Sequence, residues 1–295
     1  MRICVIFNPA ARGNKAKRFR RHLDALQGVA FKATAGPGDA QRLAAAAVKE
    51  RYDIIVAAGG DGTLNEVLNG LAVAPGGLDR VRLGVLPLGT VNVFARELGI
   101  PLRLPRAWET LQSGRERKID LAWVSFNGAQ GPERRCFAQL AGAGLDARAI
   151  ELVSWQLKKQ AGKMAYVFAG LRALAEKKPR GRLEVNGQIC EGEFIMVGNG
   201  RFYGGNFPLL PAADLADGRL DVCVFPRVDW PSLLRCVPSF ATRQRLAENV
   251  VRRFQAETFS LSCPSPMGFE LDGEWIGHLP ATFTVERQRL RVVIP

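Results

Sequence analysis

Short apolar runs alternate with helical patterns along the first third of the chain. Arg2–Phe7 and Asp53–Ala58 are apolar runs that end at turn residues, as buried strands do. The pattern predicts further elements here: a helix over Lys15–Gln27, a strand over Val29–Thr34, a helix from Asp39 as N-cap to about Arg51, a helix carrying Leu64 to Leu71, a strand over Leu83–Leu86 and a helix ending at Leu98. Strands that alternate with helices in this way build a mainly parallel sheet.

The pattern changes near residue 117, where strands begin to dominate. Strands are expected over 118–126, 134–141, 182–197, 219–225, 254–263, 267–276 and 281–294, with a hairpin turn at Asn186-Gly187. Helical insertions over about 146–177 and 230–252 interrupt them. We therefore predict an α/β domain over 1–119 and a β-rich domain over 120–284. The tail, about 285–295, is a candidate for a return to the first domain.

Composition limits the kind of partner. With 47% hydrophobic and 23% charged residues over 295 positions, the chain is typical of a packed globular protein. Lys+Arg 41 against Asp+Glu 28 gives a net charge of +13. Such a surplus favours nucleic acid, nucleotide or anionic lipid headgroups, without choosing among them. Because no apolar stretch reaches the roughly 18–20 residues of a membrane span, we expect a cytoplasmic protein with only peripheral membrane contact.

Cysteine and histidine give no sign of a zinc site. The six cysteines are scattered without a CxxC pair, and the two histidines, His22 and His278, complete no zinc pattern. Buried, reduced thiols are therefore the expected state of the cysteines.

The sharpest chemical signal is the loop Gly59-Gly60-Asp61-Gly62-Thr63. It follows a predicted buried strand and opens a helix, where backbone N–H groups and the helix dipole favour an anion. Glycines let the backbone approach a phosphate closely. Asp61 would repel phosphate directly, but it suits a site in which Mg²⁺ bridges carboxylate and phosphates.

Two further loops follow the first and fourth predicted strands. Asn8-Pro9-Ala10-Ala11-Arg12-Gly13 comes after the first, and Gly89-Thr90-Val91-Asn92 comes after the fourth and leads a helix containing Arg96. In an open parallel sheet, ligands bind outside the carboxyl ends of the strands. The three loops together predict one nucleotide site.

These motifs resemble the catalytic family of the diacylglycerol kinases, which includes soluble bacterial lipid kinases and the sphingosine and ceramide kinases. The resemblance continues through the second half of the chain, at Gly142-Ala143-Gly144-Leu145-Asp146-Ala147, Gly198–Gly205, Asp217-Gly218-Arg219-Leu220-Asp221-Val222 and Leu271-Asp272-Gly273-Glu274. One departure is Val93, which stands where many relatives carry Asp. The resemblance implies a phosphofructokinase- or NAD-kinase-like α/β domain with a parallel sheet, beside a β-sandwich domain, with ATP between them.

The resemblance also implies site residues and cofactors. The nucleotide would be bound by Asn8, Pro9, Gly13, Thr34, Gly59, Gly60, Asp61, Gly62, Thr63, Asn65, Glu66, Thr90 and Asn92. Asp61 would act through Mg²⁺, and a second, structural Mg²⁺ would be held by Asp214, Asp217 and Arg219, the outer two through their carbonyls. A lipid hydroxyl that attacks phosphate needs a carboxylate to accept its proton. Glu274 is the favoured base, with Asp272 in the metal and hydrogen-bond network; the reverse assignment stays open.

The expected function is thus an ATP- and Mg²⁺-dependent lipid kinase, with a diacylglycerol-like acceptor at the inner membrane surface. Two basic groups are candidates for contact with anionic phospholipid. One surrounds a helix with Met164, Val167, Phe168 and Leu171, and comprises Lys158, Lys159, Lys163, Arg172, Lys177, Lys178, Arg180 and Arg182. The other comprises Arg235, Arg243, Arg245, Arg252 and Arg253. Exposed edge strands would also permit a homodimer.

Other functions fit less well. An NAD kinase uses a similar Gly-Gly-Asp-Gly-Thr loop, but the segments over 198–205 and 217–222 favour the lipid branch. Gly142-x-Gly144-x-x-Ala147 fits a dinucleotide fingerprint but lies mid-chain, and no Walker A motif is present. A nucleic-acid-binding protein remains an alternative, although no such motif occurs and only three tyrosines are available for stacking.

Overall fold

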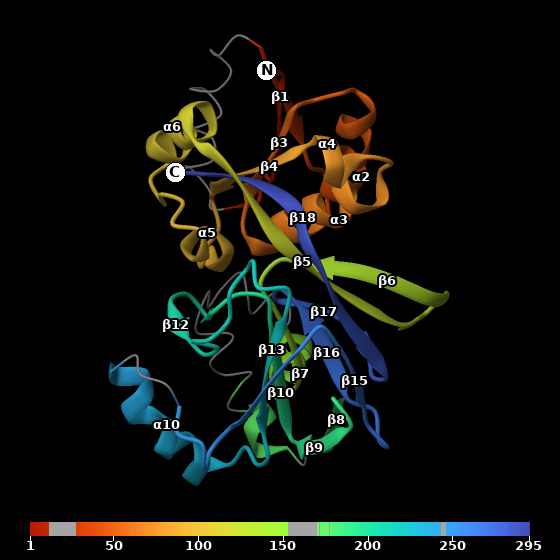
Figure 1. The fold of residues 1–295 in the computed structure, drawn as a ribbon, viewed down its shortest axis with the longest axis vertical. Helices are drawn as coiled ribbons and strands as arrows, with labels where there is room; N and C mark the ends of the chain where they lie inside the picture. The colour runs from red at the N-terminus through yellow and green to blue at the C-terminus, as the bar shows by residue number, and fades with distance from the viewer. Residues whose placement is uncertain (12–27, 153–169, 171, 177, 243–245) are drawn as a thin grey trace.

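The computed structural model describes residues 1–11, 28–152, 170, 172–176, 178–242 and 246–295. Figure 1 shows two domains stacked along the long axis of the molecule. Three sequence predictions lie wholly or mostly outside the described residues. They are Gly13, the helix over Lys15–Gln27 and most of the basic insertion over 146–177.

The first domain is a parallel sheet with helices packed on it. Its strand order is β2-β1-β3-β4, as expected for strands that alternate with helices. The elements are β1 (Ile3–Phe7), β2 (Val29–Ala33), α2 (Asp39–Lys49), β3 (Ile54–Gly59), α3 (Asp61–Val73), α4 (Gly77–Arg80), β4 (Arg82–Pro87), α5 (Val93–Glu97) and α6 (Leu104–Ser113). Strands β1 and β3 are buried along their whole length, which explains their continuous apolar runs.

The second domain is a sandwich of two sheets. Its elements are β5 (Arg115–Gly128), β6 (Gly131–Phe137), β7 (Leu140–Gly144), α7 (Leu145–Leu152), β8 (Gly181–Val185), β9 (Gln188–Gly192), β10 (Phe194–Gly198), β11 (Phe202–Tyr203), β12 (Phe207–Pro208), β13 (Leu220–Phe225), α10 (Trp230–Thr242), β14 (Arg252–Ala256), β15 (Thr258–Ser262), β16 (Gly268–Leu271), β17 (Glu274–His278) and β18 (Ala281–Ile294). In the described part of the chain, one of its sheets has the order β14-β13-β10-β7-β16-β17. Side chains such as Phe283 and Phe269, one from each sheet, meet in a single core between them.

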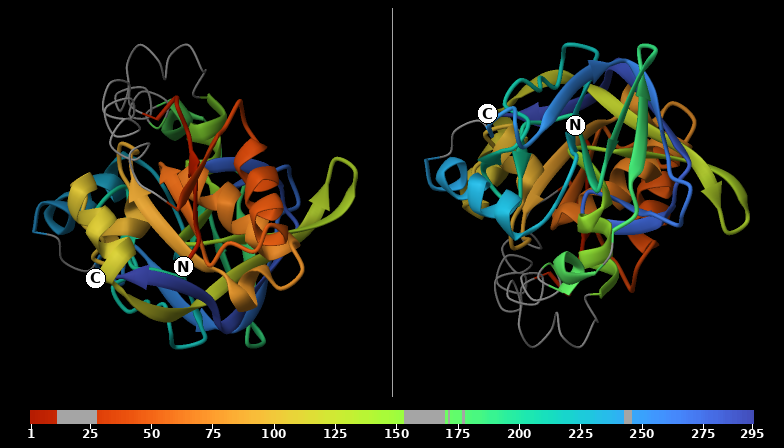
Figure 2. Two further views of the ribbon diagram at one scale, coloured as in Figure 1. Left: turned by 90° about the horizontal axis from the view of Figure 1, so that it is seen from above. Right: turned by 90° about the horizontal axis from the view of Figure 1, so that it is seen from below.

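Two long strands connect the domains. β18 pairs with β15 and β5 in the second domain, and Val292 near its end pairs in parallel with Leu83 of β4. β18 therefore extends the sheet of the first domain, and β5 runs beside it, as Figure 1 shows. Helix α10 lies apart from this junction. Seen from above and below, it stands at the outer edge of the molecule (Figure 2).

Some local predictions are confirmed and others are wrong. The Asn186-Gly187 hairpin forms between β8 and β9, with φ of 50° and 74° at the two turn residues. Asp39 is not an N-cap. Gly38 takes that position with φ of 80°, which glycine adopts without strain, and Asp39 begins the helix and accepts a hydrogen bond from the Ala35 amide. The predicted helix over 230–252 ends at Thr242, and α6 was missed.

No helix among the described residues is long and apolar enough to cross a membrane. All six cysteines are free thiols, and burial raises the pKa of Cys4 to about 11.

Candidate functional site

The three predicted loops meet at the carboxyl edge of the parallel sheet. The Asn8 side-chain amide donates to Thr63 Oγ1 at 3.0 Å, and the Gly89 amide donates to the Gly59 carbonyl at 3.1 Å. A Cβ on Gly89 would lie 2.5 Å from Gly60 Cα, so only glycine permits this approach. Thr34 joins the group through its amide, which donates to Phe7 O beside Asn8 at 2.9 Å.

The Gly59–Thr63 loop places the first turn of α3 at the centre of this group. Gly60 is the N-cap residue in an extended conformation, and Asp61 is the first helical residue. A Cβ on Gly59 would lie 2.4 Å from Thr63 Oγ1, which explains the glycine at the end of β3. The first amides of a helix have no partner within it, so this edge is suited to a phosphate.

Asp61 faces the start of the next helix. Its Oδ1 accepts a hydrogen bond from the Phe94 amide at 3.4 Å, at the first turn of α5. Burial raises the pKa of Asp61, the α5 amides oppose this, and the negative charge of Asp272 adds to it. A half-buried carboxylate beside a second one is stabilised by a cation.

Asn92 and Thr90 complete the third loop. Asn92 is the N-cap of α5 with φ of 53°, and its side-chain amide donates to Gly89 O at 3.0 Å. Thr90 is exposed beside it. The loop is thereby held against Gly60, with Thr90 turned to solvent at the sheet edge.

Asp272 belongs to the tight turn between β16 and β17 in the second domain. It has φ of 48° and is followed by Gly273 at 88°, the pattern of a two-residue hairpin turn. Its carboxylate accepts hydrogen bonds at 2.8–3.1 Å from the amides of Ala138, Gln139 and Leu140 and from Asn65 Nδ2. Burial raises the pKa of Asp272, and these donors oppose the rise. Asp272 therefore ties α3 to the second domain.

The side chain of Glu274, two residues later, contacts a different part of α3. A Cβ built on Gly62 would lie only 2.6 Å from Glu274 Oε1, so this carboxylate lies against the first turn of α3. The two candidate bases thus differ in surroundings. The oxygens of Asp272 are occupied by four donors, whereas Glu274 reaches the loop that the sequence assigned to phosphate.

Asn65 and Glu66 have structural contacts. Asn65 donates to Asp272, as described, and Glu66 accepts hydrogen bonds from the Gly38 and Ala40 amides at 2.8 and 2.9 Å, at the start of α2. Asn69, which sequence reasoning missed, pairs with both the amide and the carbonyl of Cys136. Its position one turn after Asn65 was the available signal, because two amides then share one face of a helix.

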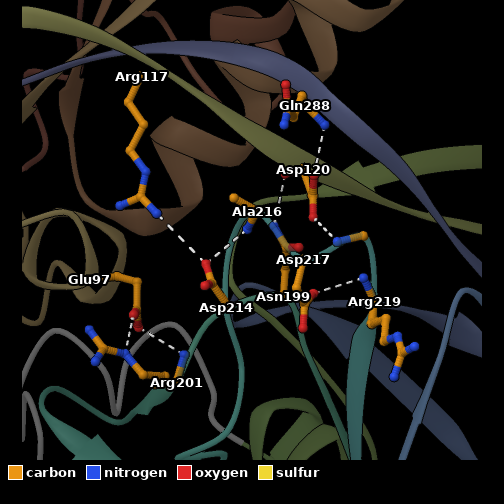
Figure 3. A network of polar contacts seen from close by, with 11 residues as sticks. Glu97, Arg117, Asp120, Asn199, Arg201, Asp214, Ala216, Asp217, Arg219 and Gln288 are labelled. Carbon is orange, nitrogen blue, oxygen red and sulfur yellow. Dashed lines mark hydrogen bonds and ion pairs between the residues drawn. The ribbon is translucent and has the colours of Figure 1, made fainter.

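Glu97 is a second missed residue. Its side chain is only 3% exposed and accepts hydrogen bonds from Gln139 Nε2 at 2.9 Å, from Arg201 N and Nε at 2.8 Å and from Phe202 N at 3.1 Å. Figure 3 shows Glu97 paired with Arg201. The loop over 198–205 is thereby fixed to α5 of the first domain.

A pair of carboxyl groups, Glu270 buried and Asp146 half-buried, lies beneath the β16–β17 turn. Glu270 accepts a hydrogen bond from the Gly273 amide at 2.7 Å, and Tyr203 donates to Asp146 at 3.0 Å. A Cβ on Gly142 would meet Glu270 Oε1 at 2.7 Å and Asp146 Oδ2 at 3.3 Å, so both carboxyl groups face one point. Burial raises the pKa of both, and for Glu270 the Asp146 charge adds to the rise.

The three residues predicted for a second Mg²⁺, Asp214, Asp217 and Arg219, lie in the turn before β13, and their role stays a prediction. Asp214 accepts from the Ala216 amide at 3.0 Å, and Asp217 accepts from the Arg219 amide at 2.9 Å (Figure 3). The Asp217 carbonyl, which is not one of the predicted carbonyl ligands, accepts from Arg287 at 2.9 Å. Asp120, which was missed, accepts from Gln288 N at 2.7 Å. Across the described residues, no three His, Cys, Asp or Glu side chains are grouped to hold a metal.

The Mg²⁺ predicted at Asp61 requires few ligands from the protein. Mg²⁺ is commonly held by one or two carboxylates together with substrate phosphates and water. Asp61 fits that role as a single half-buried carboxylate at the edge where the three loops meet.

Comparison with known proteins gives the family. Residues 2–124 match the diacylglycerol kinase catalytic domain, and residues 139–294 match the YegS C-terminal NAD kinase beta sandwich-like domain. A diacylglycerol kinase of Bacillus subtilis (strain 168) is 31% identical over 99% of this chain and 95% of its own length. The chain belongs to the diacylglycerol kinase family. A Staphylococcus saprophyticus diacylglycerol kinase is 30% identical, over 99% of this chain and 94% of its own.

Solved structures agree on the fold. A Bacillus anthracis structure named as a diacylglycerol kinase has a TM-score of 0.80 at 23% identity, covering 100% of this chain and 95% of that one. Yeast NADH kinase, complexed with NADH, has a TM-score of 0.56 at 9% identity, covering 100% and 84%. The predicted family and the predicted combination of an α/β domain with a β-sandwich are both confirmed.

Proposed function

We propose that this chain transfers the γ-phosphate of ATP to a hydroxyl group of a diacylglycerol-like lipid at the inner membrane surface. Family membership supports the kinase class. The observation that carries the assignment is the approach of the Glu274 carboxylate to Gly62, which brings a candidate base of the second domain to the phosphate loop of the first.

The loops at the sheet edge bind and orient the nucleotide. The first turn of α3 provides backbone amides for the phosphates, and Asn8 fixes Thr63 beside them. Thr34 and Thr90, on the neighbouring loops, line the same edge. Mg²⁺, when bound, would neutralise charge on the phosphates, and Asp61 would hold it. Phosphoryl transfer depends mainly on such positioning and charge compensation.

Glu274 is the general base in this proposal. The lipid hydroxyl loses its proton to Glu274 as its oxygen attacks the γ-phosphorus and the bond to ADP breaks. Asp272 has a different task. Because its oxygens accept four N–H groups, it holds Asn65 and the β6–β7 connection in place and so keeps α3 and Glu274 in register.

The test is ADP release from Mg-ATP with a panel of lipid alcohols in mixed micelles. We expect turnover with a diacylglycerol, and a loss of at least about a hundredfold in both Glu274→Gln and Asp61→Asn. Glu184→Gln, an exposed carboxylate of β8 in the same domain, serves as the matched control and should retain wild-type activity.

Two outcomes would overturn the proposal. Turnover that survives in Glu274→Gln would remove Glu274 as the base. Phosphorylation of NAD, with no lipid accepted, would assign the chain a soluble acceptor instead.

A further inference from the structure

Helix α10 begins with a firm cap, and Leu233 and Cys236 pack it against the second domain. Asp229 Oδ1 accepts hydrogen bonds from Ser232 N at 2.9 Å and Ser232 Oγ at 2.6 Å, which fixes the helix start. Leu233 and Cys236 lie against the core cluster that includes Phe225 and Val228. This side anchors the helix to the six-stranded sheet.

The opposite side of α10 presents large apolar side chains to solvent. Trp230 is 58% exposed and Leu234 is 67% exposed. Because they are four residues apart, they lie on one face of the helix, and the exposed Pro231 and Pro238 lie beside them. A tryptophan and a leucine that a well-anchored helix exposes to solvent indicate a surface that binds another molecule.

The charge around this face has one dominant sign. No Asp or Glu occurs from Trp230 to Thr242, and Arg235 is exposed at the edge of the apolar face. Arg227 is exposed just before the helix, so two arginines stand against one acid, Asp229, whose pKa the Ser232 hydrogen bonds and both arginines lower. The face therefore suits an apolar layer with negative charge at its border.

The position of α10 permits contact with a broad surface. It stands at the outer edge of the second domain in all three views (Figures 1 and 2). A stable interface with a second copy of the chain needs roughly 20–30 residues on each side. The outward side of one 13-residue helix falls well short of that.

We propose that α10 docks this chain on an anionic membrane surface, with Trp230 and Leu234 inserted at the boundary between headgroups and acyl chains. Tryptophan is enriched at that level of the bilayer, and arginines such as Arg227 and Arg235 pair with lipid phosphates there. This inference rests on the proposed function, which requires the enzyme to reach a lipid, and it identifies the element that makes the contact.

The experiment measures binding without turnover. Sedimentation with phosphatidylcholine vesicles, with and without phosphatidylglycerol, is compared for wild type, Trp230→Ser/Leu234→Ser and Ile189→Ser. Ile189 is the matched control because it is an apolar side chain of β9 that is 55% exposed and lies outside α10. We expect the double variant to bind about tenfold more weakly or worse, and Ile189→Ser to bind as wild type.

Arg235→Gln separates charge from insertion. It should weaken binding about fivefold on anionic vesicles only, which corresponds to about 1 kcal/mol for one cation at the surface. Unchanged melting temperatures would show that each variant is folded, as expected for exposed side chains. Wild-type vesicle binding by the double variant would overturn the proposal. A wild-type dimer that the double variant loses, with vesicle binding intact, would also overturn it in favour of a second copy.

Failure of docking and failure of the kinase assignment are distinguishable. A short-chain diacylglycerol dispersed as monomers requires no docking, so the double variant should phosphorylate it at the wild-type rate while losing activity on vesicles. If no acceptor is phosphorylated but vesicle binding still depends on Trp230 and Leu234, the docking inference stands and the proposed function falls.

Discussion

Substituting Gly62 by alanine tests the placement of Glu274 directly. The new Cβ would lie 2.6 Å from Glu274 Oε1, against about 3.4 Å for an ordinary contact, so the carboxylate must move by about 0.8 Å. A misplacement of about 1 Å at a reacting group costs about a hundredfold in rate. Stability should hardly suffer, because the displaced atom ends a flexible side chain and alanine favours a helix by up to about 1 kcal/mol.

The assay therefore pairs kcat with thermal unfolding. We expect kcat to fall about a hundredfold in Gly62→Ala while its melting temperature equals or exceeds that of wild type. Gly277→Ala, on the same strand as Glu274, is the matched control, because a Cβ there meets only ordinary contacts at 3.7 Å and beyond. Both values should stay at wild type in that variant.

A double-mutant cycle separates displacement of Glu274 from obstruction of the nucleotide. If Gly62→Ala acts through Glu274, it should cause little further loss when added to Glu274→Gln. Additive losses would show that the methyl group acts on the phosphate loop itself. Wild-type kcat in Gly62→Ala would refute the reasoning altogether, since the base would then tolerate the shift.

Three further outcomes follow from the buried polar groups. Asp272→Asn should lower the free energy of unfolding by about 2–3 kcal/mol in urea titration, because an amide cannot accept from all four donors; equal stability would contradict its anchoring role. Glu97→Ala should cost about 2–3 kcal/mol by the same measurement, whereas the exposed Glu109→Ala should cost almost nothing. Burial raises the pKa of Asp146 above its ordinary 3.8, so its contribution to stability is present below pH 4 and is lost as pH rises through the raised value. Asp146→Asn should accordingly melt at a higher temperature than wild type at pH 8 and vary less with pH, and an unchanged pH dependence would count against the buried pair.

The sequence predicts the location of the site better than its internal contacts. The loops at Asn8, Gly59–Thr63 and Thr90 could be grouped because parallel strands end at a common edge, a rule that needs only the order of elements. The contacts of Asp272 with Asn65 and of Glu97 with Arg201 join residues far apart in the chain. No local pattern specifies such pairs, so their roles emerge only from the fold.

The sequence also does not specify the contacts of some residues that are close together in the chain. Asp272 and Glu274 stand in one tetrapeptide, and the sequence favours Glu274 as the base while leaving the reverse assignment open. The hairpin turn gives them different surroundings, because Asp272 accepts from amides of the β6–β7 connection and Glu274 lies against the first turn of α3. Likewise, the sequence predicts Asp39 as a helix N-cap, but Gly38 occupies that position with a positive φ. In both cases backbone geometry, which residue type only partly predicts, sets the contacts of the side chain.

The strand β18 has a consequence for how the protein is made. The sheet of the first domain pairs along β4 with a strand at the far end of the chain, Leu83 with Val292. A ribosome adding roughly 5–20 residues per second needs about 10–40 seconds between those two positions. During that interval the nascent first domain has an unpaired strand edge, which is a template for wrong pairing. We therefore expect synthesis speed and chaperone access at this stage to affect the yield of correctly folded protein.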